Sequence, residues 1–531
     1  MIFMKISGVK RTFFAVTLCI LAIVASLFAL VRALNSQMPQ NIRPEVRIEI
    51  DVGWEFVVSS EDEVSLFEGD ELVGVLSPGV WKVRSNVNIE AGRPAEQPTP
   101  STIESTSELE HEDIVFKDVG FIFRNRGVAS DVNVKVAVVA PFRLKLKPPS
   151  SPIVGLFRKG RLRRKFRSLG TIEVYTSDDK LILSTDKPVR FKPTRGGFLG
   201  LSNKQLSPTN LYFGILEFRL TPIGRVRCIN EIDIEEYLKG VLAAEMSPSF
   251  PLEALKAQAV VARSFTLANW YRKIRSGRIS PYDFSDEAVF QMYRGAKRVS
   301  ERVEIAVDAT RGEVLTWNGT IAETRYHSSC GGHTENAFDL WGILPYLQGV
   351  SDLRYASTTP DLRTESGVRA WLNASPNAFC KIPPDAPKTL QYARANYRWS
   401  VTYTRQELER IIREKTGFDP GTLLEIVPIS RGVSGRVLKM MIRGTKGVYT
   451  VEGELNIRKA LAPDMLKSSL FIIDVERGSD GLPELFIIKG GGFGHGVGMC
   501  QVGAAMMAYD GYDYRAILEH YFPKLELKKV Y

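Results

Sequence analysis

The chain has 531 residues, of which 44% are apolar and 24% are charged, so it is long enough for about two to four globular domains and is not intrinsically disordered. Its formal net charge of +10 predicts an anionic partner or surface, although the sign alone does not choose between nucleic acid, membrane lipid and an acidic cell-wall polymer. The five cysteines are scattered along the chain and are too few for a disulfide scaffold.

Residues 1–34 are predicted to form a membrane anchor or signal segment. Lys5, Lys10 and Arg11 precede the largely apolar run from Thr12 to Val31, which has the length needed to span a bilayer. Signal-peptide apolar regions are usually shorter, which favours an uncleaved anchor. We therefore expect a single-pass protein of the cell membrane, with the bulk of the chain outside the cytoplasm.

The next two hundred or so residues are predicted to form two β-rich regions. Alternating apolar residues begin at Val46 and short strand-like runs follow, which predicts a small β module over residues 43–90. Residues 91–113 are rich in Pro, Ser, Thr and Glu and are typical of a linker. Strand-like alternation resumes in a second region, residues 114–205.

The most basic segment of the chain, RKGRLRRKFR, lies in this second β-rich region, from Arg158 to Arg167. Such a run with little aromatic interleaving is a weak signal for nucleic-acid binding. For an exported protein, phosphate polymers, glycan carboxylates or lipid headgroups are better candidates, and a solvated loop is the alternative. We do not predict nucleic acid as a partner.

Residues 206–531 mix strand and helix patterns, which predicts an α+β domain. Two strand candidates from Leu211 onward lead into a pair of helices separated by Ser247, Pro248 and Pro251. Residues 405–415 form a clear amphipathic helix pattern, and strand-like runs follow it.

Glu245 is the candidate catalytic residue, at the turn between the two helices. It ends an apolar run in the last turn of the first helix, where unpaired carbonyl groups and loss of water both disfavour the ionised carboxylate. A carboxylic acid kept protonated near neutral pH can donate its proton to a departing glycosidic oxygen and later accept one. From spacing alone, a solvated residue at a helix end is the alternative.

The second helix carries two candidate substrate-binding cations. Lys256 and Arg263 are seven residues apart and share a helix face that differs from the apolar stripe. Paired cations can hold the carboxylate or acetamido groups of an anionic polymer, whereas an ordinary solvated face is the other interpretation.

Tyr326 to Gly342, YHSSCGGHTENAFDLWG, brings His327, Cys330 and His333 within seven residues. Imidazole and thiolate both suit zinc, but the spacing fits no standard zinc module and no fourth ligand is apparent. The alternative is a polar turn whose side chains bind substrate or brace the backbone, and we predict no metal site.

Gly490 to Ala504, GGGFGHGVGMCQVGA, is glycine-rich, which lets the backbone approach a ligand or another segment closely. The run is neither a dinucleotide fingerprint nor a P-loop. His495 is placed to polarise a sugar hydroxyl or orient Glu245, and Gln501 is expected to begin a helix. A histidine satisfied by backbone partners is the alternative for His495.

Four ordered segments resemble the SpoIID/LytB family, which includes stage II sporulation protein D and amidase enhancers. The segments are INEIDIEEYLKGVLAAEM, LEALKAQAVVARSFTLA, YHSSCGGHTENA and GGGFGHGVGMCQVGAAMMAYDGYDYRAILEHYFP, within a match that runs from about Leu211 to the C-terminus. The resemblance implies peptidoglycan glycan strands as substrate, with Glu245 as the acid and base of a lytic transglycosylase. The alternative it implies is a wall-binding protein that stimulates or recruits an amidase, so other cell-wall hydrolases are expected partners.

The resemblance also implies that Lys256, Arg263, Tyr326, His327 and His495 line a glycan groove, with Gln501 beside them. Some relatives carry a zinc-binding Cys segment, but here the matching stretch, FSDEAVFQMYRG, has Ser285 and Phe290 where thiols are expected. No zinc ion and no other cofactor is therefore predicted. Outside the cytoplasm a disulfide between two of Cys330, Cys380 and Cys500 is compatible with the sequence, which does not pair them.

Overall fold

The computed structural model describes residues 45–53, 55–86, 157–158, 161–162, 171–195, 197–202, 210–221, 224–277, 280–285 and 291–531. The predicted membrane segment, the predicted linker and most of the basic run lie outside these residues. Among the helices that are described, none is long and apolar enough to cross a membrane.

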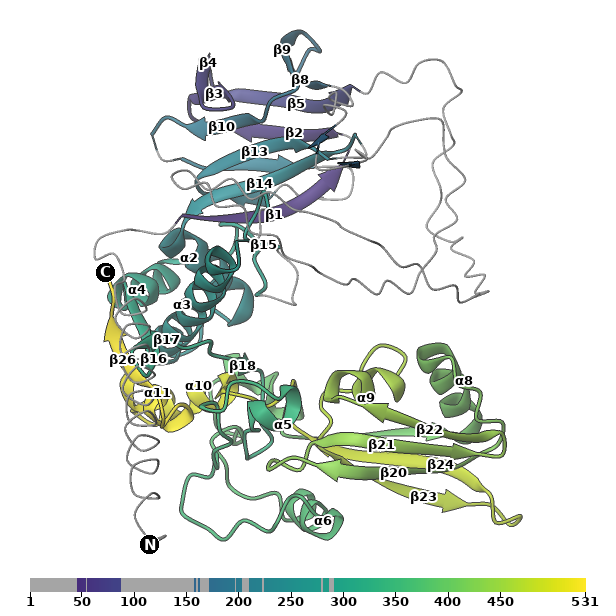
Figure 1. Ribbon diagram of the computed structural model, residues 1–531. Helices are drawn as coiled ribbons and strands as arrows, with labels where there is room; N and C mark the ends of the chain where they lie inside the picture. Colours follow the sequence, from purple (N-terminus) through teal and green to yellow (C-terminus); the bar gives the residue numbers. More distant parts are fainter. Residues whose placement is uncertain are drawn as a thin grey trace, which may run out of the picture.

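Two antiparallel sheets stack at one end of the molecule (Figure 1). The first has seven strands, in the spatial order β15 (Phe284–Ser285), β1 (Glu45–Gly53), β14 (Val226–Asp233), β13 (Ile215–Leu220), β10 (Val189–Pro193), β3 (Val64–Glu68) and β4 (Glu71–Leu76); β15 alone pairs in parallel. The second has six, in the order β12 (Asn210–Tyr212), β11 (Leu199–Ser202), β2 (Glu55–Ser60), β5 (Gly79–Asn86), β8 (Thr171–Thr176) and β9 (Leu181–Thr185). A separate short hairpin joins β6 (Phe157–Arg158) to β7 (Arg161–Leu162) within the basic run.

Aromatic side chains fill the space between the two sheets. Phe56 of the second sheet lies 5.6 Å from Phe218 of the first, measured between ring centroids, and Trp81 lies 6.0 Å from Phe191 in the same way. In β2 buried and partly exposed residues alternate strictly, because successive side chains of a strand point to opposite faces. The alternation seen in the sequence therefore does build a β layer.

The predicted division of the N-terminal half into separate modules was wrong for the described residues. Strands from residues 45–86 and from residues 171–202 share both sheets. The boundary predicted at residue 206 also cuts through them, because β13 and β14 lie between β1 and β10. Periodicity within a strand does not reveal which distant strand it pairs with, so the sequence pattern could not show this interleaving.

A helical layer follows the sheets and centres on α3 (Leu252–Arg275). Every residue of this helix from Ala254 to Ala268 except Lys256 is buried, a wider surface than the single predicted stripe, because its alanines allow neighbours to pack on several sides. Around it lie α2 (Ile234–Glu245), α4 (Glu301–Ala309), α10 (Gln501–Tyr509), α11 (Tyr514–Tyr521) and a small sheet of β17 (Thr320–Ile321), β16 (Glu313–Trp317) and β26 (Glu526–Lys529). Short elements complete the layer and its connections: β18 (Tyr326–His327), β25 (Met499–Cys500), α5 (Ala337–Trp341), α6 (Glu365–Ala374), α7 (Lys388–Gln391) and a 3-10 turn, η1 (Arg394–Asn396).

Residues 398–491, here called the inserted unit, form a second body with its own apolar core (Figure 1). It contains one sheet of β19 (Arg398–Thr404), β24 (Pro483–Gly491) and β23 (Phe471–Arg477), a second of β20 (Leu423–Arg431), β21 (Val437–Gly444) and β22 (Gly447–Glu452), and helices α8 (Arg405–Thr416) and α9 (Glu454–Ala460). The predicted amphipathic helix is confirmed as α8, which begins with a capping box between Thr404 and Glu407. The α+β class is confirmed.

Candidate active site

Glu245 is the last residue of α2, as the sequence predicted. The chain leaves the helix at Met246 in an extended conformation, and Pro251 then starts α3. The prolines of this connection cannot continue α2, since proline lacks a backbone donor and restricts the residue before it. Glu245 therefore lies at a sharp helix-to-helix turn.

The carboxyl group of Glu245 is half-buried and held by two neighbours. Its Oε1 accepts a hydrogen bond of 2.7 Å from the backbone N–H of Met292, and the hydroxyl group of Tyr326 also bonds to the carboxyl group. Burial raises the pKa of Glu245, and the two hydrogen bonds only partly oppose that effect. In the part of the chain that the structure describes, no charged side chain contributes to this shift, so the carboxyl group can remain protonated at higher pH than an ordinary glutamate.

Gln501 holds the backbone of the turn. Its side-chain amide donates to the backbone carbonyl of Glu245 at 3.3 Å and to Oε1 of Gln258 at 3.4 Å. Gln501 is the first residue of α10, as predicted. Its position fixes where the Glu245 main chain lies.

The two later motifs meet next to this turn, because β18 pairs in parallel with β25. Tyr326 lies opposite Met499, and His327 lies opposite Cys500. The glycines make this approach possible: a Cβ on Gly498, whose φ is +72°, would lie 2.1 Å from the carbonyl oxygen of Arg325. Segments about 170 residues apart are thus brought into contact. Of the two uses predicted for the glycines, close approach to a ligand or to another segment, the structure shows the second.

His327 and His495 lie in contact, with ring centroids 5.7 Å apart. Nδ1 of His327 donates to the carbonyl group of Val497 at 3.1 Å, and Nδ1 of His495 accepts from the N–H of Val497 at 3.0 Å. Burial lowers the pKa of His495 well below its ordinary value, and the positive charges of nearby arginines act in the same direction. His495 is therefore a neutral imidazole, and both rings are braced by backbone groups.

Arg263 does not line a groove, which corrects the sequence prediction. Its guanidinium is fully buried and makes two hydrogen bonds to the carboxylate of Glu235, at 2.6 and 2.9 Å. A long polar side chain on a helix looks the same in the sequence whether it faces solvent or a buried partner, so the pattern could not separate the two cases.

Lys256 lies on the surface of α3 but is paired within the same helix. Its Nζ is 2.6 Å from a carboxylate oxygen of Glu253 and lies over the ring of Tyr514 at 5.8 Å from the centroid. Its role in binding substrate stays a prediction.

Several residues near Glu245 were missed by the sequence analysis. The Met292 N–H and the amide of Gln291, which accepts from the Tyr326 hydroxyl at 3.3 Å, come from a segment that the sequence analysis considered only for zinc. Trp341 packs against His495 at 5.3 Å and is 39% exposed, so its ring is available to a ligand. The sequence did contain a signal for Trp341, because an aromatic residue is unexpected in the polar turn predicted there.

The guanidinium of Arg325 lies between Phe265, at 4.8 Å from the ring centroid, and Trp341, at 5.5 Å. Burial lowers the pKa of Arg325 to about 10, and the charge of Arg272 adds to the effect. Arg325 still carries its charge at neutral pH. It directly precedes Tyr326 in the chain, so this charge lies close to the candidate active site.

Comparison with known proteins identifies this architecture. Residues 223–317 match the family described as SpoIID, stage II sporulation protein, and residues 335–498 match a domain of unknown function, DUF8618. An uncharacterised protein of Brachyspira hyodysenteriae is 32% identical over 318 residues, which cover 60% of this chain and 72% of that protein. The chain belongs to the SpoIID family.

Two named relatives are more distant. The stage II sporulation protein D of Bacillus amyloliquefaciens is 28% identical over 317 residues, or 57% of this chain and 76% of that protein. The amidase enhancer of Bacillus subtilis is 28% identical over 311 residues, or 54% of this chain, and the match spans only 39% of the enhancer.

Proposed function

We propose that this protein is a peptidoglycan lytic transglycosylase that cleaves the linkage between N-acetylmuramic acid and N-acetylglucosamine, with Glu245 as its single acid and base. Membership of the SpoIID family associates the chain with peptidoglycan processing in the cell wall. The observation that carries the finer proposal is the half-buried Glu245 carboxyl group, whose pKa is raised by burial, with no contribution from a charged side chain among the described residues.

The proposed reaction has two proton transfers. Protonated Glu245 donates to the glycosidic oxygen as the bond from that oxygen to the muramyl anomeric carbon breaks. The muramyl C6 hydroxyl attacks the same carbon, and the Glu245 carboxylate accepts the hydroxyl proton. The products are a free N-acetylglucosamine hydroxyl and a 1,6-anhydromuramyl end, so Glu245 returns to its protonated form and no water is consumed.

The surroundings of Glu245 fit this use of one carboxyl group. Glycosidases that use water as the final acceptor need a second carboxylate, either as base or as nucleophile. Here the acceptor is part of the substrate, and the groups that bond to the Glu245 side chain are a backbone N–H and the Tyr326 hydroxyl. Trp341 is 39% exposed and offers an aromatic surface to a sugar ring, and Arg325, whose guanidinium is paired with Glu323, adds positive charge beside it.

The test is an assay on purified glycan strands, with and without their stem peptides. Full-length protein is expected to release fragments with 1,6-anhydromuramyl ends, identified by mass spectrometry, and Glu245→Gln is expected to release none above background. Undiminished product from Glu245→Gln, or hydrolysed reducing ends in place of anhydro ends, would refute the mechanism.

A second candidate function is stimulation of a separate amidase, favoured by the similarity to a protein named amidase enhancer. On this proposal the protein binds wall glycan without cleaving it, and binding survives Glu245→Gln. Adding the protein to an amidase and intact wall would then raise the amidase rate equally for wild type and variant. A cell-membrane location with the bulk of the chain outside remains part of both proposals.

A further inference from the structure

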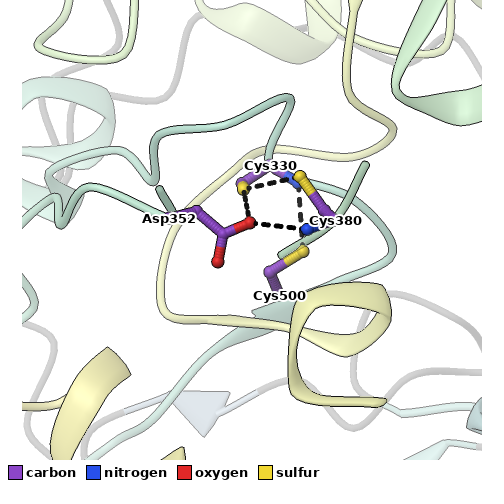
Figure 2. A group of neighbouring side chains, drawn as sticks. All are labelled: Cys330, Asp352, Cys380 and Cys500. Atoms are coloured by element: carbon purple, nitrogen blue, oxygen red, sulfur yellow. Dashed lines mark hydrogen bonds between the residues drawn. The ribbon is translucent and has the colours of Figure 1, made fainter. Parts of the chain in front are cut away.

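Three cysteines and one aspartate from four separate segments converge on one buried point. Cys330 follows β18, Asp352 lies in the loop between α5 and α6, Cys380 lies between α6 and α7, and Cys500 ends β25 and caps α10. All four residues are buried with no measurable exposure, and their ligand atoms all lie within 4.8 Å of one another (Figure 2).

The spacing of these atoms is close to that of a tetrahedral metal site. Sγ of Cys330 lies 3.4 Å from Sγ of Cys380 and 3.2 Å from Oδ2 of Asp352. Zinc bonds of about 2.3 Å to sulfur and 2.1 Å to oxygen place neighbouring ligand atoms about 3.6–3.8 Å apart. The two short separations are about 0.4 Å below these values, and the widest separation in the cluster, at most 4.8 Å, exceeds them by up to about 1 Å. Side-chain adjustments of this size would let one ion contact all four atoms.

Backbone N–H groups already point at the sulfur and carboxylate atoms. The N–H groups of Cys330 and Gly503 donate to Sγ of Cys500 at 3.2 and 3.3 Å, and that of Gly332 donates to Sγ of Cys330 at 3.3 Å. Donors of this kind stabilise the ionised ligands of a metal site.

The carboxylate of Asp352 is equally well supported. Its Oδ2 accepts from the N–H of Cys380 at 3.0 Å, and its Oδ1 accepts from the hydroxyl of Tyr521 at 2.6 Å. Oδ1 therefore has a fixed partner, which leaves Oδ2 as the atom that faces the three sulfurs (Figure 2).

The charge around the cluster also suits a bound cation. Among the described residues the only ion pair of Asp352 is a distant one, 3.8 Å from Nε2 of His520. Three thiols and a carboxylate that are fully buried are expensive to ionise without a cation between them. The buried guanidinium group of Arg436 donates to the carbonyl of Cys330, and that of the partly buried Arg398 donates to the carbonyl of Gly331. These two charges would offset the excess negative charge of a thiolate-rich site.

We propose that Cys330, Asp352, Cys380 and Cys500 bind one zinc ion in a closed structural site. Four protein ligands leave no open position for substrate, so the ion would stabilise the fold and would take no part in glycan chemistry. This ligand set replaces the one considered from the sequence: His333 bonds instead to the carbonyl of Thr334, and His327 faces Val497 and His495.

Such an ion would also help to hold the backbone segments that carry residues of the candidate active site. Cys500 directly precedes Gln501, whose amide holds the backbone of Glu245, and Cys330 follows His327 by three residues. One ion would thus tie together the two motifs that meet at β18 and β25, together with the loop that carries Cys380. The inference does not depend on the proposed glycan cleavage.

The first test is spectroscopic and uses the full-length protein, reduced and stripped with a chelator. Titration with Co²⁺ is expected to produce thiolate-to-metal charge-transfer bands and the visible bands of a tetrahedral site, saturating at one equivalent per chain, and Zn²⁺ is expected to abolish them. Absence of these bands in correctly folded protein, or saturation far from one equivalent, would overturn the proposal.

Variants assign the ligands. Cys380→Ser and Asp352→Asn are expected to weaken Co²⁺ binding by more than about tenfold, whereas Cys228→Ser, which changes a buried cysteine of β14 outside the cluster, should bind as wild type does. Equal binding by Cys380→Ser and Cys228→Ser would contradict the proposed ligand set. If Cys380→Ser does not fold, the wild-type titration decides alone.

A disulfide between Cys330 and Cys380 is the competing use of these sulfurs. Protein purified without reductant in a Cys19→Ser background should show all four remaining thiols when denatured with chelator, together with one zinc per chain by mass spectrometry. Two missing thiols and no zinc would establish the disulfide and overturn the metal site.

Discussion

Helix α2 carries Glu235 in its first turn and Glu245 in its last, and these two glutamates lie in opposite environments. Glu235 faces the buried guanidinium of Arg263, and its pKa is lowered because that positive charge and its hydrogen bonds outweigh the effect of burial. Glu245 has a backbone N–H and a phenol for partners, and burial raises its pKa. The same residue type is therefore a fixed anion at one end of the helix and a candidate proton donor at the other.

The largest expected effect is on activity, through Glu245→Gln. An amide has no proton to transfer, so the rate of glycan cleavage should fall by roughly 100- to 10,000-fold. The thermal midpoint should stay close to that of wild type, because no ion pair is broken. A large drop in the midpoint would mean that Glu245 is a structural residue like Glu235.

The converse variant, Glu235→Gln, should act on stability. It leaves the Arg263 guanidinium buried without its counter-charge, which typically costs about 3–5 kcal/mol. Denaturant titration measures the free energy of unfolding, and Glu236→Gln on the same helix is the control, with an expected change below about 1 kcal/mol. If both variants unfold at the same denaturant concentration, the buried pair does not stabilise the fold.

Glu235 and Glu245 also show which features of the site could be predicted from the sequence and which could not. The turn that carries Glu245 followed from the positions of the prolines. The glycine density of residues 490–504 indicated a close approach to a ligand or another segment, but not that the segment is the one beginning at Tyr326. The partner of Arg263 did not, because Glu235 is 28 residues away and nothing in the helix pattern points to it. The cysteine cluster was hidden for the same reason: Cys380 and Asp352 come from loops that carry no periodic pattern.

Tyr326→Phe should sharpen the contrast by changing only the surroundings of Glu245. The lost hydroxyl is one of the two bonds that lower the pKa of Glu245, so its removal should raise that pKa further. Because the acid must be protonated to donate, the alkaline limb of the pH–rate profile should move to higher pH, by up to about one unit for a bond of on the order of 1 kcal/mol. A limb that moves to lower pH would mean that a different group governs it.

The two glutamates should also give opposite pH dependences of stability. The raised pKa of Glu245 stabilises the fold fully below the ordinary glutamate pKa, and this contribution is lost as pH rises through the folded-state value. The lowered pKa of Glu235 stabilises the fold above the ordinary value, and this contribution is lost as pH falls through the folded-state pKa. Denaturant titrations of Glu245→Gln across pH should no longer show the loss of stability that Glu245 causes as pH rises. They should still show the loss that Glu235 causes as pH falls.

The smallest effect is expected for Lys256→Ala. The pair with Glu253 is partly solvated and spans three residues of one helix, so its removal should cost less than about 1 kcal/mol. Denaturant titrations of Lys256→Ala and Arg263→Ala, done in parallel, compare the free energy of unfolding that each cation contributes. The sequence had predicted that these two cations share one helix face. A loss for Lys256→Ala as large as that for Arg263→Ala would show that depth of burial does not separate them.

The interleaved sheets impose an order on folding. Strand β1, near the start of the chain, lies between β14 and β15, and Glu45 pairs with Asp233, about 190 residues later. At typical synthesis rates of about 5–20 residues per second, that interval lasts on the order of 10–40 s. Throughout this interval the apolar face that carries Val46 and Ile48 has no strand beside it in its sheet. Within the two stacked sheets, the earliest described strand to leave the ribosome is therefore among the last to be paired.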